Sequence, residues 1–67
     1  MNVVICYYNE DGESSITPKK MKVLPRVGER VALRRKHKVI YLRVKDILHD
    51  ETIQLTCDLI RVEQFKD

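Results

Sequence analysis

Polar and apolar residues alternate with a period of two along much of the chain, a pattern typical of half-buried β-strands. The clearest case is residues 30–44. Val31 and Leu33 fall on one side of the first arm, and residues 39–44 are rich in the β-branched and aromatic side chains that suit a pleated surface. A short run of positive charge joins the two arms. The pattern predicts a β-hairpin with a basic tip.

The N-terminal part predicts two further strands. Residues 3–8 are apolar at odd and even positions alike, as expected of a central strand covered on both faces. The Asp11-Gly12 pair favours a tight turn, and a second strand should start near Ser14. Because this second strand has one apolar residue and contains Pro18, we expect it at an edge of the sheet. Residues 19–27 fit a short strand or an irregular crossing, and residues 25–29 are a turn signal.

The apolar phase changes twice in the C-terminal half. Ile40, Leu42 and Val44 fall on even positions, whereas Ile47 is odd, and this predicts a β-bulge near residues 45–46. Residues 52–59 are apolar at odd positions, and then Ile60 and Val62 move to even ones, which indicates a possible second bulge. We expect a turn at residues 49–51 and a short helical turn in the tail, residues 63–67.

No window of a dozen residues repeats apolar positions at helical spacing, so the predicted fold class is all-β. A chain of 67 residues is one domain, 1–67, and a chain this short buries roughly 60% of its unfolded surface. Five or six short strands favour an antiparallel sheet closed into a small barrel, because closure removes the exposed edges that promote aggregation.

A short motif supports the barrel. Residues 24–33 contain Pro25, Gly28, Glu29 and Val31 in the pattern Pro-x-x-Gly-Glu-x-Val. This run, with Tyr41, Val44 and Ile47 beyond the hairpin tip, resembles the entry of Src-homology-like small barrels. The resemblance implies a barrel of that architecture, and such barrels serve many functions.

Members of this class differ in what they bind. Those that bind proline-rich peptides use an aromatic-lined groove, and the absence of tryptophan from this chain argues against that activity. Others are nucleic-acid or ribosome-associated modules. Small barrels encoded by bacteriophages and mobile elements often bind a host protein instead.

The basic tip is the candidate binding site. The chain has 13 Lys and Arg against 10 Asp and Glu, and the candidate residues are Arg34, Arg35, Lys36, His37, Lys38 and Arg43. They would contact phosphates of a nucleic-acid backbone or of another polyanion, without sequence readout, while an exposed tyrosine could stack on an unpaired base. Lys19, Lys20, Lys22 and Arg30 could extend this site. Two alternatives stay open: a solubilising hairpin end, and a protein–protein interaction module that binds an acidic protein surface.

The sequence offers no enzymatic chemistry. His37 and His49 lie outside any nucleophile or metal-ligand motif, and the His49-Asp50 pair is better explained as a turn. Cys6 and Cys57 fall in apolar runs and should be reduced and buried. We therefore expect no catalytic residue, no cofactor and no metal ion. The N-terminus lacks the features of a secretion signal, and no apolar run reaches the roughly 18 residues of a membrane span, so we expect a cytoplasmic protein without a membrane partner.

Overall fold

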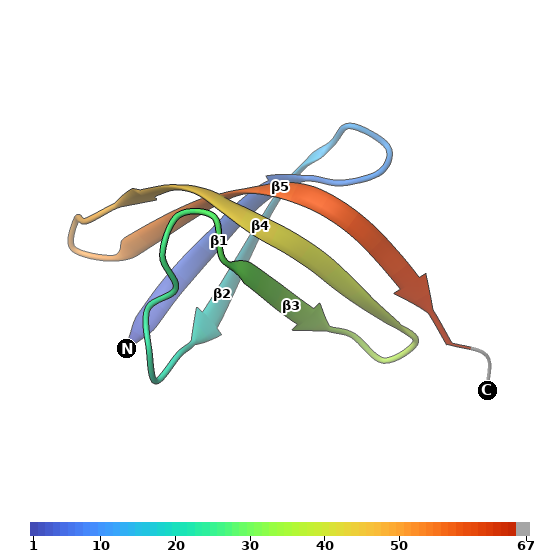
Figure 1. Cartoon of the computed structure of the whole chain (residues 1–67), viewed down its shortest axis with the longest axis horizontal. Helices are drawn as coiled ribbons and strands as arrows, with labels where there is room; N and C mark the ends of the chain where they lie inside the picture. Colours follow the sequence, from blue (N-terminus) through green and yellow to red (C-terminus); the bar gives the residue numbers. More distant parts are fainter. Residues whose placement is uncertain (66–67) are drawn as a thin grey trace.

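Five strands form a single mixed sheet, shown in Figure 1, in a computed structural model that describes residues 1–65. The strands are β1 (Asn2–Tyr8), β2 (Ser14–Lys20), β3 (Arg30–Arg34), β4 (Lys38–Leu48) and β5 (Ile53–Gln64). Their order across the sheet is β2-β1-β5-β4-β3. Neighbouring strands are antiparallel except β1 and β5, which run parallel. The all-β prediction, the basic hairpin and the edge position of β2 are thus confirmed.

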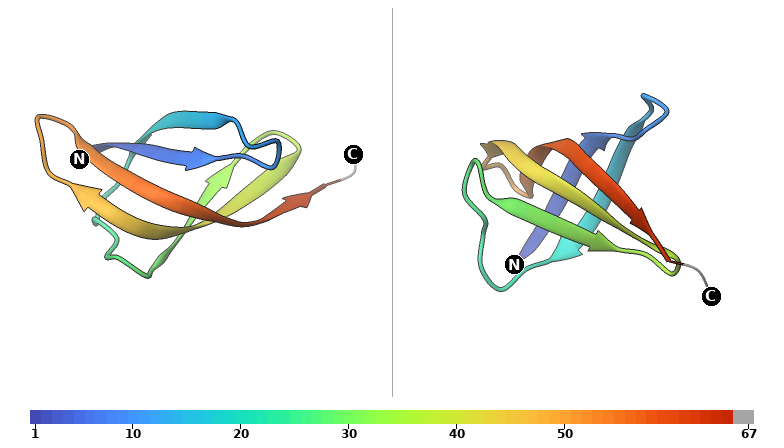
Figure 2. Two further views of the ribbon diagram at one scale, coloured as in Figure 1. Left: turned by 90° about the horizontal axis from the view of Figure 1, so that it is seen from above. Right: turned by 45° about the vertical axis from the view of Figure 1, so that its right-hand side comes forward.

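The sheet curves into a half-barrel that stays open between its two edge strands (Figure 2). Within residues 1–65, no ladder pairs β2 with β3. The prediction of a closed, wholly antiparallel barrel was therefore wrong on both counts. The cause is the strand order: β5 returns beside β1 in the same direction, and this leaves the short strand β3 at the far edge.

The segment between the edge strands, residues 21–29, is an irregular crossing that covers part of the open side. Its side chains Met21 and Leu24 pack against the core. Its first end is attached to the N-terminus, because Met21 N donates to Met1 O at 2.9 Å. Its other end is attached to β4, where Gly28 N donates to Val44 O at 2.8 Å. Gly28 has φ +93°, a conformation that favours glycine, as the turn prediction required.

Both predicted β-bulges are present in the β4–β5 ladder. Lys45 is the extra residue of β4, between the Val44–Cys57 and Asp46–Thr56 pairs. Ile60 is the extra residue of β5, because Leu42 pairs with Leu59 and Tyr41 pairs with Arg61. A bulge bends its strand and changes which side chains point inward. Ile47 and Val62, which lie beyond the two bulges, consequently pack against the core.

The core lies on the concave face of the sheet and is entirely apolar. No polar or charged residue is buried in the described part of the chain. The members of this core cluster that are less than 2% exposed are Ile5, Leu33, Leu42, Leu55, Val3 and Val44. These residues come from four strands, β1, β3, β4 and β5, so the core forms only when the whole sheet is assembled.

Two details of the sequence interpretation need correction. Strand β5, and not β1, occupies the centre of the sheet, and β1 is covered on one face only, since Val3, Ile5 and Tyr7 are buried whereas Tyr8 is exposed. Residues 63–64 continue β5 and do not form a helical turn. The end of that predicted turn, residues 66–67, lies outside the described residues.

The first testable prediction concerns this core. Leu55 is 0% exposed in the central strand, so Leu55→Ala should lower the free energy of unfolding by about 2–5 kcal/mol, measured by urea denaturation. Ile16→Ala is the matched control, because Ile16 is also an aliphatic strand residue but is 67% exposed. An unchanged unfolding midpoint for Leu55→Ala would contradict the packing described here.

Candidate functional site

The basic tip, residues 34–38, is a tight turn at the end of the β3–β4 hairpin. Arg34 ends β3 and Lys38 begins β4. Arg35 N donates to Lys38 O at 2.8 Å and closes the turn. All five side chains are exposed, and His37 O accepts a bond of 2.8 Å from Phe65 N, just beyond the end of β5. The backbone of the tip is therefore held on both sides while its charged groups face solvent.

The tip lies across the open side from the edge strand β2. The Arg35 guanidinium donates through Nη2 to Thr17 Oγ1 at 3.2 Å. Lys19 follows two residues later and therefore shares the face of β2 that carries Thr17. This contact links the basic tip to the strand that ends in Lys19 and Lys20.

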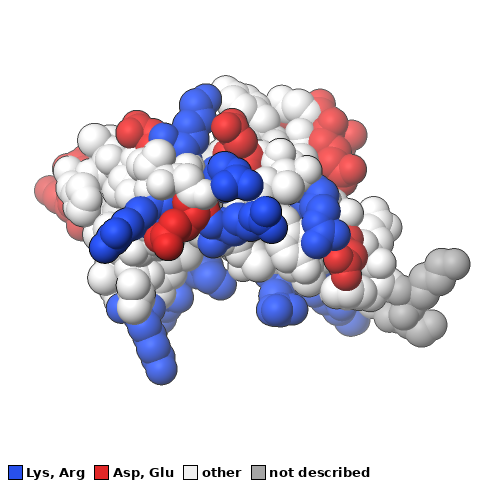
Figure 3. Space-filling model, in the orientation of Figure 1, with Lys and Arg blue, Asp and Glu red and all other residues white. Residues whose placement is uncertain are grey.

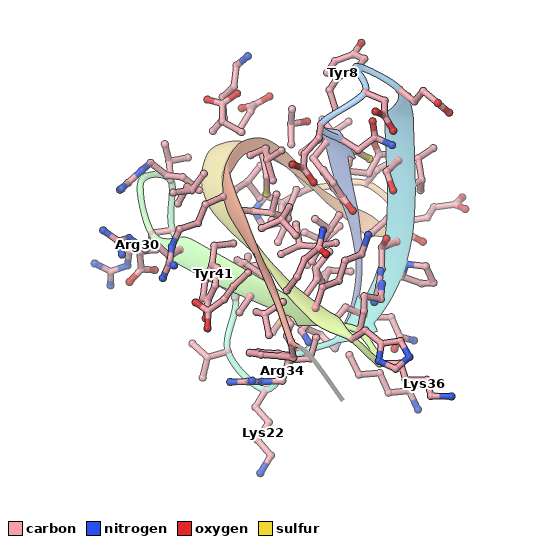
Figure 4. All side chains as sticks on the ribbon, turned by 90° about the vertical axis from the view of Figure 1, so that its right-hand side faces the viewer. Tyr8, Lys22, Arg30, Arg34, Lys36 and Tyr41 are labelled. Carbon is pink, nitrogen blue, oxygen red and sulfur yellow. The ribbon has the colours of Figure 1, made fainter. Side chains whose placement is uncertain are left out.

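Positive charge gathers on one side of the molecule, which we call the underside and which is lowest in Figures 1, 3 and 4. Figure 3 shows Lys and Arg side chains along this margin with no acidic group among them, and Figure 4 shows Arg34, Lys36 and Lys22 at the lower end of a perpendicular view. We define the underside as the basic tip together with Lys19, Lys20 and Lys22. In the described part of the chain, no ion pair neutralises a lysine or arginine of this set.

The charges are also segregated along the sequence. Residues 14–45 contain eleven of the 13 Lys and Arg but only one of the ten Asp and Glu, namely Glu29. The turn between β1 and β2 carries Glu10, Asp11 and Glu13, and the turn between β4 and β5 carries Asp50 and Glu51. The modest net charge of +3 conceals this division. This division agrees with the expected extension of the site to Lys19 and Lys20 of β2.

Arg43 does not join the basic tip. It lies five residues beyond Lys38 on β4, about 16 Å along an extended strand, and pairs in register with Arg30. One guanidinium nitrogen, Nη1, donates to Gly28 O at 2.8 Å. The structure thus separates the predicted site residues into the tip and a second position on the outer face of the sheet.

The two cysteines lie near each other, although they are far apart in sequence. Both are free thiols, and both line a cavity of about 190 Å³ with Lys45 and Asp58. Cys57 is buried as predicted, whereas Cys6 is half-buried. Burial, with smaller contributions from Cys6 and Asp58, raises the pKa of the Cys57 thiol from 9.0 to about 11. A raised pKa keeps this thiol protonated and unreactive.

The remaining candidate features from the sequence are the His49-Asp50 pair and a metal site. His49 and Asp50 are both exposed in the turn that follows β4. No group of three or more His, Cys, Asp and Glu side chains among residues 1–65 is placed to hold a metal ion. None of these residues belongs to a helix long and apolar enough to span a membrane.

No protein-family model, no curated protein and no solved structure matches the chain. The function of the basic surface is therefore inferred from its residues alone.

The second testable prediction concerns the thiols. In the unmodified protein, the rate at which iodoacetamide alkylates Cys57 should rise with pH towards about pH 11, because only the thiolate reacts. At pH 8, a thiol with a pKa two units above the ordinary value alkylates about 100-fold more slowly. Mass spectrometry measures the alkylation rate of Cys57. The Cys57→Ala variant gives the alkylation rate of Cys6 for comparison. Half-maximal alkylation of Cys57 at pH 9 or below would contradict the described burial.

Proposed function

We propose that this protein is a non-enzymatic binding module that holds the backbone of a nucleic acid through the basic tip. One observation carries the proposal: the tip and the lysines at the end of β2 lie on one side of the molecule, and no ion pair among residues 1–65 neutralises a lysine or arginine there. Like charges held together raise the energy of the folded domain, and a bound polyanion removes that cost.

The chemistry of the underside suits phosphate contacts. Lysine and arginine side chains donate to phosphate oxygens, and each phosphate that they neutralise releases condensed counterions. Such contacts give affinity and orientation, but they do not read sequence. The bound polyanion would therefore be recognised by its charge spacing and not by its bases at this site.

A second candidate, a protein-interaction module, is favoured by a different surface. The outer face of β1 and β2 presents Tyr8 and Ile16, which are 70% and 67% exposed. Half-buried Val4 and Cys6 lie beside them, since Cys6 pairs with Ile16 and Val4 pairs with Pro18. An apolar strip of this kind suits a protein partner better than a nucleic acid.

The third testable prediction separates these candidates by salt. For four to six phosphate contacts, the logarithm of the binding constant should fall with the logarithm of salt concentration with a slope of about −3 to −5. Fluorescence anisotropy of labelled DNA and RNA measures this slope. A partner captured by the apolar strip should show a far weaker dependence. Retention of a protein partner without retardation of any nucleic acid at low salt would favour the second candidate.

The fourth testable prediction concerns the tip itself. Arg34→Glu combined with Lys36→Glu should abolish nucleic-acid binding and leave the melting temperature nearly unchanged, because both side chains are exposed. The matched control is Arg26→Glu with Lys45→Glu, which changes the net charge equally. Lys45 lies about 23 Å along β4 from Lys38. If the reversed tip binds as tightly as the unmodified protein, the tip is solubilising surface and the first candidate fails.

A further inference from the structure

Tyr41 lies near the middle of the outer face formed by β3, β4 and β5. On this face it is flanked in register by Ala32 of β3 and by Arg61 of β5. Its side chain is half-buried, although it points away from the core. Ala32 is too short to cover the side of the ring that faces β3.

Four arginines surround this tyrosine. Arg30 and Arg34 flank Ala32 on β3, Arg43 follows two residues along β4, and Arg61 lies directly opposite on β5. Since residues two apart on a strand share a face, all four belong to the surface that carries Tyr41. Figure 4 shows Tyr41 between Arg30 and Arg34 on the same side of the sheet.

Arg61 is stacked on the ring. Its guanidinium carbon lies 4.4 Å from the centroid of Tyr41. Arg61 Nη1 also donates to Glu63 Oε2 at 3.0 Å, which fixes the guanidinium over the ring, and the Arg61 side chain remains 60% exposed. One face of the guanidinium plane therefore meets the tyrosine while much of the side chain is open to solvent.

The acidic groups nearby are already paired. Glu63 is bound to Arg61, and Asp58 lies 3.9 Å from Lys45 Nζ. No ion pair among residues 1–65 holds Arg30, Arg34 or Arg43. Three arginines beside Tyr41 thus keep donors for a ligand with several negative charges.

An aromatic ring, a stacked guanidinium plane and unneutralised arginines on one sheet face together fit an unpaired nucleotide. Bases of single strands stack on tyrosine rings and on arginine planes, while the phosphates contact neighbouring cations. A base inside a duplex cannot use such a platform, because both of its faces are already stacked. A surface of this kind would favour single strands over double strands, which phosphate contacts at the basic tip alone would not do.

We propose that the ligand is a single-stranded nucleic acid, with one base stacked on the Tyr41–Arg61 pair and its phosphates on Arg34, Arg30 and Arg43. This inference rests on the proposed function and adds the strandedness of the ligand. The proposed binding surface is continuous from the basic tip to the outer face, because Arg34 belongs to both. From Arg34 to Arg30 it covers four residues of β3, about 13 Å.

The fifth testable prediction compares a 12-nucleotide oligothymidylate with a blunt duplex of the same length, each measured by fluorescence anisotropy. The unmodified protein should bind the single strand more tightly. Tyr41→Leu keeps an apolar side chain over the sheet but removes the ring, and should weaken single-strand binding about five- to 150-fold. Tyr41→Leu should leave duplex binding unchanged. Tyr41→Phe keeps the ring and should bind the single strand as tightly as the unmodified protein does.

Tyr8→Leu is the matched control, because Tyr8 is a more exposed tyrosine on β1, two strands away from β4 on the outer face, and this variant should bind both ligands normally. Intrinsic fluorescence gives a second readout. The chain has three tyrosines and no tryptophan, so stacking on Tyr41 should quench tyrosine emission, and Tyr41→Phe should remove that quenching.

The outcomes separate this inference from the proposed function. If Tyr41→Leu binds the single strand as tightly as the unmodified protein does, then Tyr41 only stabilises the sheet. Backbone binding by the tip would then stand alone. Equal affinity for the duplex and the single strand would overturn the inference in the same way. Absence of binding to either ligand at low salt would overturn both proposals.

Discussion

The shape of this domain depends on the two bulges of the β4–β5 ladder. Val44 and Ile47 are three positions apart, so an unbroken strand would place them on opposite faces. The extra residue Lys45 allows both side chains to pack on the core, and Ile60 does the same for Leu59 and Val62. Bulges also bend long strands, and without that curvature five strands could not enclose so small a core. The bulge at Ile60 brings Arg61 opposite Tyr41, so the same bulge also places the Arg61 guanidinium beside the Tyr41 ring on the outer face.

The positive charge beside the open side of the half-barrel also has a structural explanation. Unpaired edge strands attract other strands, and proline and charged residues on an edge discourage this. Pro18, Lys19 and Lys20 on β2 fit that explanation, as do Arg30 and Arg34 on β3. Edge protection does not require the two further cations of the hairpin turn, Arg35 and Lys36, because a turn has no ladder to protect. The proposal of a binding site therefore depends on the tip more than on the edges.

The sequence predicted what depends on local pattern. The strands, the Asp11-Gly12 turn, the basic tip and both bulges follow from the phase of apolar residues and from turn chemistry, and all are present. The parallel pairing of β1 with β5 and the unpaired edge of β3 were not predictable. Strand order is decided by contacts distant in sequence, which a period of two does not encode.

The candidate site shows the same division. The tip residues are consecutive, so their proximity followed directly from the hairpin. The separation of Arg43 from the tip could have been deduced, because the hairpin register places it opposite Arg30. The contacts of Arg35 with Thr17 and of Arg61 with Tyr41 depend on the assembled sheet, and no sequence signal pointed to either.

Net charge is a poor guide to what this surface can attract. The acidic β1–β2 turn lies at the top of Figure 1 and the basic tip lies near the bottom, and the molecule extends 24 Å in this direction. The Debye length is about 8 Å at physiological ionic strength, so the charges of that turn are largely screened at the tip. A polyanion approaching the underside meets the local cluster of cations and not the average of +3. The same separation would orient a polyanionic ligand, because a ligand arriving from the acidic side would be repelled before it could contact the tip.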